Sequence, residues 1–354
     1  MALPPTMLAL KSLTHDRTAI QFVPLPSLRP GYILVKVSHV ALNPTDWKHR
    51  SWFPTPGATI GCDYSGTVVQ VDRAVTAPFR PGERIAGFAH GTNKLQPEDG
   101  AFAEYAVVKG DTQMMVPEGL SDAEAATLGV GLTTVGQALY RSLKLPLPWE
   151  GGKEGQERPW VLVYGGSTAT GSLAIQFARE SGARVVSTCS PRNAEWVEGL
   201  GAERVFDYSK AEVGREIRGF TGGKLRLAFD CISEDESLAI CADAFDPEVG
   251  GKISVLLPTD FEREKVDLQE TRAYMSTGED IDYFGLPLKK DLNEFEWLKE
   301  FWRRSTELFR DGKVKVHPLE VRKSGLEGIS EGLDDLRDGK VSGVKLVYNV
   351  GATK

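Results

Sequence analysis

A glycine- and hydroxyl-rich run in the middle of the chain has the composition of a phosphate-binding loop. The run 161–171 reads VLVYGGSTATG, with paired glycines after an apolar stretch and hydroxyl residues before the last glycine. Glycines at such a turn let backbone amides approach a pyrophosphate, and the N-terminus of a following helix stabilises its charge. Ser167, Thr168 and Thr170 can donate further hydrogen bonds. The spacing departs from GxGxxG, so the run alone is a weak indication of a nucleotide site.

The residues after the next apolar run indicate which dinucleotide would bind. About 20 residues beyond such a loop, a site for NAD places an acidic residue on the ribose 2′-hydroxyl. This chain has TCSPRN over Thr188–Asn193, without a carboxylate. Ser190 can donate to a 2′-phosphate, and Arg192 can pair with it. We therefore expect NADPH rather than NADH as the cofactor.

A polar segment nearer the N-terminus carries a second set of reactive side chains. The run 38–50 reads SHVALNPTDWKHR and follows a strand-like stretch, Ile33–Val37. We expect a polar turn here that presents Asp46 and Lys48. A lysine beside a bound nicotinamide could donate a hydrogen bond or a proton. Lys48 is therefore the candidate catalytic residue, although a solvated surface lysine is the alternative.

The pattern of the chain predicts the elements that would position these residues. Residues up to about 120 contain short β-branched or aromatic runs separated by turn clusters. From Trp160 onward, strand-like runs alternate with helical stretches, which predicts an α/β fold with a doubly wound parallel sheet. An amphipathic helix is predicted over Leu292–Phe309. The predicted strands of the parallel sheet are 160–164, 184–188, 204–206, 225–230 and 252–257.

Composition limits the classes of partner and compartment. The chain has 354 residues, of which 41% are hydrophobic and 26% charged, enough for two packed domains. A net charge of −7 without a dominant basic patch argues against nucleic acid and anionic membranes as partners. The start, MALPPTMLAL, lacks the basic region of a signal peptide. The four cysteines are far apart and form no CxxC pair, which indicates reduced thiols. We therefore expect a cytoplasmic protein.

The two parts of the chain together resemble the medium-chain dehydrogenase/reductase superfamily over almost the whole length. The resemblance implies a GroES-like β-barrel domain, formed by residues 1–125 and 311–354, and a Rossmann NADPH-binding domain over residues 126–310. Zinc-dependent members carry a ligand cysteine, a GHE motif and a four-cysteine lobe. Asp46 stands at the first of these positions, and GCD over Gly61–Asp63 replaces GHE. We therefore expect no metal, and reduction of an activated double bond rather than alcohol oxidation.

Several short runs are similar to the fungal trans-acting enoyl reductases of polyketide biosynthesis, the family of the lovastatin enoyl reductase. The resemblance implies an NADPH-dependent reductase of α,β-unsaturated acyl chains. These chains would be tethered to the acyl carrier protein of a partner highly reducing polyketide synthase. The matching runs are NPTDWK (43–48), VYGGSTAT (163–170), TCSPRN (188–193), VFDY (205–208), LAFDCI (227–232) and SG (342–343).

The same resemblance implies roles for individual residues. A helix around 133–143 would line the acyl pocket, and its residues there are Thr134, Val135, Gly136, Gln137, Ala138, Leu139, Tyr140, Arg141 and Ser142. The implied NADPH contacts are Thr45, Asp46, Trp47, Lys48, Ser167, Thr168, Ala169, Thr170, Ser190, Pro191, Arg192, Asn193, Tyr208, Leu256, Leu257, Gly343 and Val344. Tyr208 would flank the adenine.

Two other functions fit the same fold and cofactor. One is a stand-alone quinone or alkenal reductase, and the other is a non-catalytic NADPH-binding protein. Charged segments after Leu257, at Thr259–Lys265 and Gly278–Asp282, would prevent a sheet edge from pairing with a second copy. We therefore expect a monomer, with that surface available to the synthase.

Overall fold

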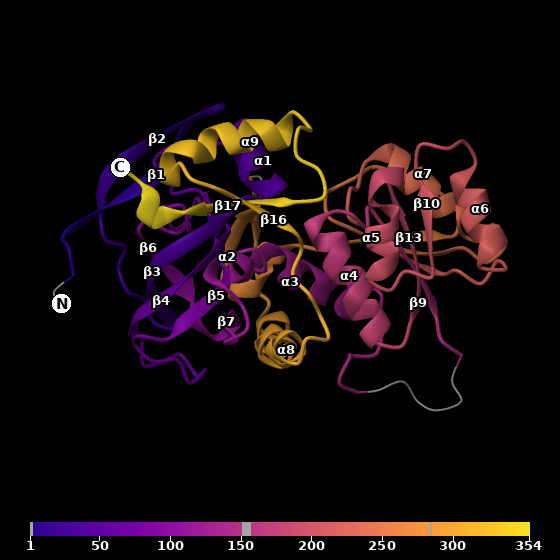
Figure 1. Cartoon of the computed structure of the whole chain (residues 1–354), viewed down its shortest axis with the longest axis horizontal. Helices are drawn as coiled ribbons and strands as arrows, with labels where there is room; N and C mark the ends of the chain where they lie inside the picture. The colour runs from indigo at the N-terminus through magenta and orange to yellow at the C-terminus, as the bar shows by residue number, and fades with distance from the viewer. Residues whose placement is uncertain (1–2, 151–156, 284) are drawn as a thin grey trace. The chain divides into compact units, whose positions relative to one another are not determined.

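The computed structural model describes residues 3–150, 157–283 and 285–354, and it divides the chain into two units (Figure 1). The first unit comprises Met1–Thr133, Tyr274–Asp311 and Val316–Lys354, and the second Thr134–Ala273 and Gly312–Lys315. The second unit is narrower than the Rossmann domain expected over 126–310. Helix α8 (Leu292–Arg310) lies in the first unit, where it packs on strand β7 (Gln113–Met115).

An antiparallel sheet forms the centre of the first unit. Its strand order is β16-β17-β3-β4-β5-β7, with β6 also paired to β3, and only the β16–β17 pair is parallel. Alternate apolar residues of these strands fill the core, so the prediction of a β-rich first part is confirmed. The strands are β3 (Tyr32–Ala41), β4 (Asp63–Val71), β5 (Arg84–Phe88), β6 (Tyr105–Lys109), β7, β16 (Leu319–Arg322) and β17 (Lys345–Asn349), beside hairpins β1 (Thr6–Thr14)–β2 (Arg17–Pro24) and β14 (Ile281–Tyr283)–β15 (Leu286–Leu288).

Helix α1 (Pro44–Trp52) replaces the polar turn that the sequence predicted around Asp46 and Lys48, and that prediction was wrong. Pro44 occupies the first helical turn, and the Asp46 carboxylate accepts the Asn43 N–H at 2.8 Å. A proline at the first helical position and an acid two residues later are helix-start signals, because they suit the donors left free there. The Asn-Pro pair was instead interpreted as a turn.

Helix α1 packs on helix α9 (Ile329–Arg337) through a buried arginine. The Arg50 side chain is 2% exposed, donates to the Ser330 carbonyl at 3.2 Å and pairs with Asp334. A charge-assisted contact of this kind fixes geometry as well as adding stability. The first two turns of α1, which carry the predicted catalytic lysine, are therefore held from the C-terminal end of the same helix.

The second unit contains a six-stranded parallel sheet in the order β10-β9-β8-β11-β12-β13, which is the strand order of a Rossmann fold. The five predicted strands are confirmed, whereas β13 was missed because its VDLQE sequence is polar. The strands are β8 (Trp160–Tyr164), β9 (Arg184–Cys189), β10 (Arg204–Asp207), β11 (Leu227–Asp230), β12 (Gly251–Val255) and β13 (Val266–Glu270). Its helices include α4 (Ala169–Glu180), α5 (Ala194–Gly199), α6 (Val213–Phe220) and α7 (Asp235–Asp243).

Two further helices follow strand β7 along the chain. Helix α2 (Asp122–Ala125) starts at a capping box, in which Ser121 Oγ accepts the Glu124 N–H at 3.2 Å. Helix α3 (Gly129–Val135) follows and continues as a π-helix over Gly136–Ser142. Across all the described ranges, no helix is long and apolar enough to span a membrane.

A buried ion pair holds the start of α1 against the sheet of the first unit. Lys345, 4% exposed, donates to Asp63 Oδ2 at 2.5 Å, to Asn43 Oδ1 at 2.9 Å and to the Thr127 carbonyl at 3.0 Å. The other Asp63 oxygen accepts the Val130 N–H at 2.6 Å. All three protons of the ammonium therefore have an acceptor, which is the condition for a charge to be tolerated inside a protein.

Replacement of Lys345 by methionine should lower the free energy of unfolding by about 3–5 kcal/mol, because it leaves a buried carboxylate without its cation. Urea unfolding followed by circular dichroism would measure the loss. Lys340→Met is the matched control, because the Lys340 side chain is 61% exposed beside Asp338. The control should change stability by less than about 1 kcal/mol. Equal losses in both variants would contradict a role for Lys345 as an anchor.

Candidate functional site

The predicted phosphate loop connects β8 to α4 and has the geometry of an anion-binding turn. Gly165 has φ +80°, a conformation that favours glycine. A Cβ at Gly171 would lie 2.3 Å from the Gly165 carbonyl oxygen, so only glycine allows this close approach. Thr168 caps the helix by accepting the Gly171 N–H at 2.9 Å. The N–H groups of the first turn of α4, flanked by half-buried Ser167 and Thr170, are suited to a pyrophosphate.

The other predicted cofactor contacts of the second unit also follow the carboxyl ends of its parallel strands. Ser190–Asn193 comes after β9, Tyr208 after β10, and Leu256 with Leu257 after β12. The parallel pairing brings these ends to one edge of the sheet, where ligands of doubly wound folds bind. Ser190 Oγ lies 3.2 Å from the Tyr208 hydroxyl, and the Tyr208 ring is 44% exposed. An exposed ring at this edge is a suitable stacking surface for a nucleobase.

Polar groups surround the end of strand β9. The segment Ser190–Asn193 contains no carboxylate. The Asn193 side-chain amide is buried and its Nδ2 has no hydrogen-bond partner in the protein, which is unusual for a buried donor. The neighbouring Asp207 carboxylate accepts from its own loop, at 3.0 Å from Ser209 N and 2.7 Å from Ser209 Oγ. The choice between NADPH and NADH stays a prediction.

Lys48 on helix α1 contacts two tryptophan rings. Its Nζ lies 5.7 Å from the ring centroid of Trp47 and 5.2 Å from that of Trp52. The two rings meet edge to face at 5.3 Å, so they form one aromatic surface. An ammonium within about 6 Å of an indole ring is attracted to its electron-rich face. Lys48 is half-buried beside these rings, and its catalytic role stays a prediction.

Two further predicted contacts precede strand β17 in the same unit. Gly343, with φ +69°, and Val344 are both half-buried. They directly precede Lys345, whose ammonium binds Asn43 at the start of α1. Residues from the two ends of the chain, 43–48 and 343–344, are therefore held by one hydrogen-bonded centre.

A buried polar cluster lies behind the first turn of α1, and sequence analysis missed its central residue. The Tyr274 hydroxyl is 2.6 Å from Thr45 Oγ1 and 3.8 Å from Cys62 Sγ. Burial raises the pKa of both the Tyr274 phenol and the Cys62 thiol well above their usual values. Both groups therefore remain protonated at neutral pH and act as hydrogen-bonding groups rather than as anions.

Asp46 lies in the same cluster and titrates near neutrality. Burial raises its pKa to about 7, and the hydrogen bond from the Asn43 N–H only partly offsets that effect. Burial also lowers the pKa of His49 to about 4 and that of His90 to about 3, so both imidazoles are neutral. Within the part of the chain that the structure describes, no three His, Cys, Asp or Glu side chains form a group that could hold a metal ion.

The helix predicted to line the acyl pocket is mostly packed inside the protein. Val135, Ala138 and Leu139 are fully buried, and the Tyr140 hydroxyl lies 3.0 Å from Ser181 Oγ on the turn after α4. Gln137 Nε2 donates to the Arg272 carbonyl at 3.0 Å. Segments of π-helix are rare overall, but those that occur are often found at functional sites. This conformation is therefore compatible with a pocket wall. The substrate contacts over Thr134–Ser142 stay a prediction.

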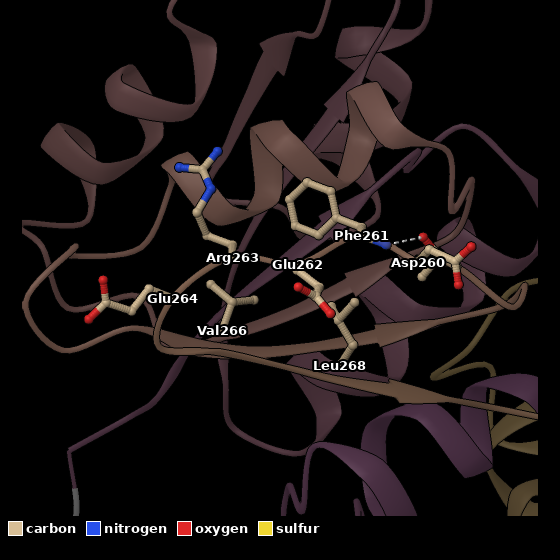
Figure 2. Close-up of a pocket in the computed structure, with 8 residues that line it drawn as sticks. Asp260, Phe261, Glu262, Arg263, Glu264, Val266 and Leu268 are labelled. Carbon is tan, nitrogen blue, oxygen red and sulfur yellow. Dashed lines mark hydrogen bonds between the residues drawn. The ribbon is translucent and has the colours of Figure 1, made fainter.

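A hollow beside strand β13 is separate from the predicted contacts (Figure 2). The Arg263 guanidinium there lies 3.0 Å from Asp243 of helix α7, and the Phe261 N–H donates to Thr259 Oγ1 at 3.0 Å. Because strand β13 is the last strand of the sheet, the charged segment predicted after Leu257 does flank a sheet edge. The hollow is lined by Thr259, Asp260, Phe261, Glu262, Arg263, Glu264, Val266 and Leu268.

The fold and the two matched domains are those of the medium-chain dehydrogenase/reductases. The family described as "Alcohol dehydrogenase GroES-like domain" matches residues 29–118, and "Zinc-binding dehydrogenase" matches residues 169–256. The structure is similar to an alcohol dehydrogenase superfamily protein from Novosphingobium aromaticivorans. The TM-score is 0.78 and the identity 23%, over 97% of this chain and 99% of that one. The expected combination of a GroES-like domain and a Rossmann sheet is therefore confirmed.

Closer relatives define the family within this superfamily. Trans-enoyl reductase ACTTS2 of Alternaria alternata is 45% identical, over 98% of this chain and 99% of its own length. Trans-enoyl reductase resD of Aspergillus sclerotiorum is 42% identical, over 96% and 97% of the two chains. This chain belongs to the trans-enoyl reductase family, as its short sequence runs predicted.

The stability of the Asp46→Asn variant, relative to that of the unaltered protein, should increase as the pH rises. The folded carboxyl group has a pKa of about 7, above its unfolded value of 3.8. Between these values the folded state binds a proton that the unfolded state has released. The contribution of Asp46 to stability is thus complete below the lower value and is lost as the pH rises through the upper one. Asparagine keeps an acceptor for the Asn43 N–H but does not titrate.

The measurement is the unfolding free energy of the unaltered protein and of the variant at about pH 5 and at about pH 8. Between these pH values, the stability of the variant relative to the unaltered protein should increase by about 2–3 kcal/mol. Glu118→Gln, at an exposed position, is the control and should show no such trend. A pH-independent difference for Asp46→Asn would mean that the carboxyl group is ionised throughout this range.

Proposed function

We propose that this chain is an NADPH-dependent trans-acting enoyl reductase. It reduces the α,β-double bond of acyl chains on the acyl carrier protein of a partner highly reducing polyketide synthase. Membership of the trans-enoyl reductase family, at 45% identity over 98% of the chain, carries this proposal and makes the chain an oxidoreductase acting on CH–CH bonds. The donor-rich end of strand β9, without a carboxylate, supports NADPH as the cofactor.

The residues of this chain have separate tasks in such a reaction. Bound NADPH supplies the hydride that adds to the β-carbon of the substrate. The first turn of α4 and the residues after β9 bind the phosphates, and Tyr208 stacks on the adenine. Lys48 donates a hydrogen bond or a proton as negative charge develops on the thioester carbonyl and the α-carbon is protonated. Its contacts with Trp47 and Trp52 hold the ammonium in place.

We also propose that the enzyme acts as a monomer. Strand β13 ends the parallel sheet, and the segment before it carries Asp260, Glu262, Arg263 and Glu264. Charges beside a sheet edge oppose pairing with the edge of a second copy. This surface is then available to the synthase. Sedimentation of the purified protein at micromolar concentration tests the point.

The function is tested by following NADPH oxidation with an α-methyl enoyl thioester of pantetheine and, separately, with a small quinone. Turnover of the thioester without turnover of the quinone is the expected result. Turnover of the quinone alone would contradict the proposal and indicate a detoxifying reductase. In the same assay Lys48→Met should lower kcat/KM for the thioester by about 100- to 10,000-fold. Lys36→Met, at an exposed position of β3, should leave it unchanged.

Arg192→Ala should weaken the binding of NADPH and leave the binding of NADH unchanged. The guanidinium pairs with the 2′-phosphate, which only NADPH carries, and a charge-assisted contact of this kind is worth about 10- to 100-fold in affinity. Titration of the two cofactors by fluorescence gives both dissociation constants. Arg215→Ala is a suitable control, because that side chain is 65% exposed on helix α6. An equal loss for the two cofactors would show that Arg192 does not recognise the phosphate.

A further inference from the structure

Tyr274 is fixed by aromatic neighbours, and its hydroxyl points to helix α1. The rings of His90 and His49 lie 4.7 and 5.4 Å from the Tyr274 ring, and the Phe88 ring lies 5.6 Å away. The residue is 7% exposed. A ring confined in this way keeps its hydroxyl at a fixed point, 2.6 Å from Thr45 Oγ1.

The surroundings of the Tyr274 hydroxyl determine where its single proton goes. Cys62 Sγ lies 3.8 Å away, and the negative charge of Asp46 acts on both Cys62 and Tyr274. The positive end of the O–H dipole is favoured on the side of these groups. The tyrosine oxygen can then accept a hydrogen bond from the Thr45 hydroxyl, since a hydroxyl has one donor and two acceptor sites.

A threonine in the first turn of a helix does not otherwise have one fixed conformation. Its χ1 angle can adopt more than one staggered rotamer, and no preceding helical turn offers a carbonyl to fix it. A hydrogen bond at 2.6 Å to a buried tyrosine selects one of them. In the arrangement that these neighbours favour, the Thr45 hydroxyl donates its hydrogen bond to Tyr274, and Thr45 Oγ1 then presents lone pairs to a ligand.

We propose that Tyr274 is a positioning residue that orients Thr45 as a hydrogen-bond acceptor for NADPH. The inference rests on the proposed function, because Thr45 is there a cofactor contact. NADPH offers suitable donors in its ribose hydroxyls and its carboxamide N–H groups. Tyr274 itself does not touch the cofactor in this account and acts through Thr45 alone.

A double-mutant cycle on NADPH affinity tests this dependence. Tyr274→Phe removes one oxygen and keeps the ring, and Thr45→Val keeps the size of the side chain. Each single variant should raise the dissociation constant for NADPH about 5- to 10-fold, the value of one hydrogen bond. The double variant should bind no more weakly than Thr45→Val. Multiplicative losses, or an unchanged affinity in Tyr274→Phe, would overturn the proposal.

Two controls separate positioning from packing. Tyr283→Phe removes a hydroxyl from a ring 6.5 Å from Tyr274 and should leave the affinity unchanged. Thr45→Ser keeps the hydroxyl, so it should bind NADPH almost as the unaltered protein does, and it should lose that affinity in the Tyr274→Phe background. If Tyr274→Phe fails to fold, Thr45→Ser against Thr45→Val still decides whether the Thr45 hydroxyl is needed, and equal affinity in the two would overturn the proposal.

The unaltered protein separates this inference from the proposed function. Binding of NADPH without reduction of the enoyl thioester would contradict the proposed function. The double-mutant cycle would still test the role of Tyr274. Reduction of the thioester with a strictly multiplicative cycle would leave the function intact and remove the inference. Absence of NADPH binding by the unaltered protein would overturn both.

Discussion

The ammonium of Lys345 is the constraint on which the first unit depends. It binds Asp63 of strand β4, Asn43 before helix α1 and the Thr127 carbonyl before α3, although Asn43 and Lys345 are 302 positions apart in sequence. A buried charge requires all of these acceptors, because desolvation of an unpaired ammonium is expensive. The requirement fixes the start of α1 relative to β17. The candidate contacts at 45–48 and 343–344 are therefore set by the same centre.

The same ammonium contacts Asp63 directly and acts on Asp46 only from a distance. Lys345 pairs directly with Asp63, and the hydrogen bond from Val130 satisfies the second oxygen of that carboxylate. Burial raises the pKa of Asp46 to about 7, and the negative charge of Asp63 adds to that effect. One cation compensates one anion in a low-dielectric interior, and the second acid is held partly in its neutral form.

The sequence was sufficient for the parts of the structure that depend on local pattern. The alternation of apolar runs predicted five strands of the parallel sheet, and the glycine spacing predicted the loop before α4. The polar strand β13 was not predicted, because a strand at a sheet edge does not need apolar residues. Tyr274 could not have been predicted, because its partners Thr45 and Cys62 lie 229 and 212 positions away. Only tertiary packing brings such residues together.

The chemistry of the cluster behind α1 follows from burial. The cluster contains the Cys62 thiol with the Tyr274 hydroxyl 3.8 Å away, and Asp46 lies in it. Burial raises the pKa of the thiol and the phenol, so these groups orient hydrogen bonds but do not ionise. Lys48, half-exposed on helix α1, adds an ammonium beside two indole rings. In the proposed reaction, the buried groups would keep the geometry fixed for hydride transfer, and Lys48 would meet the charge that the transfer creates.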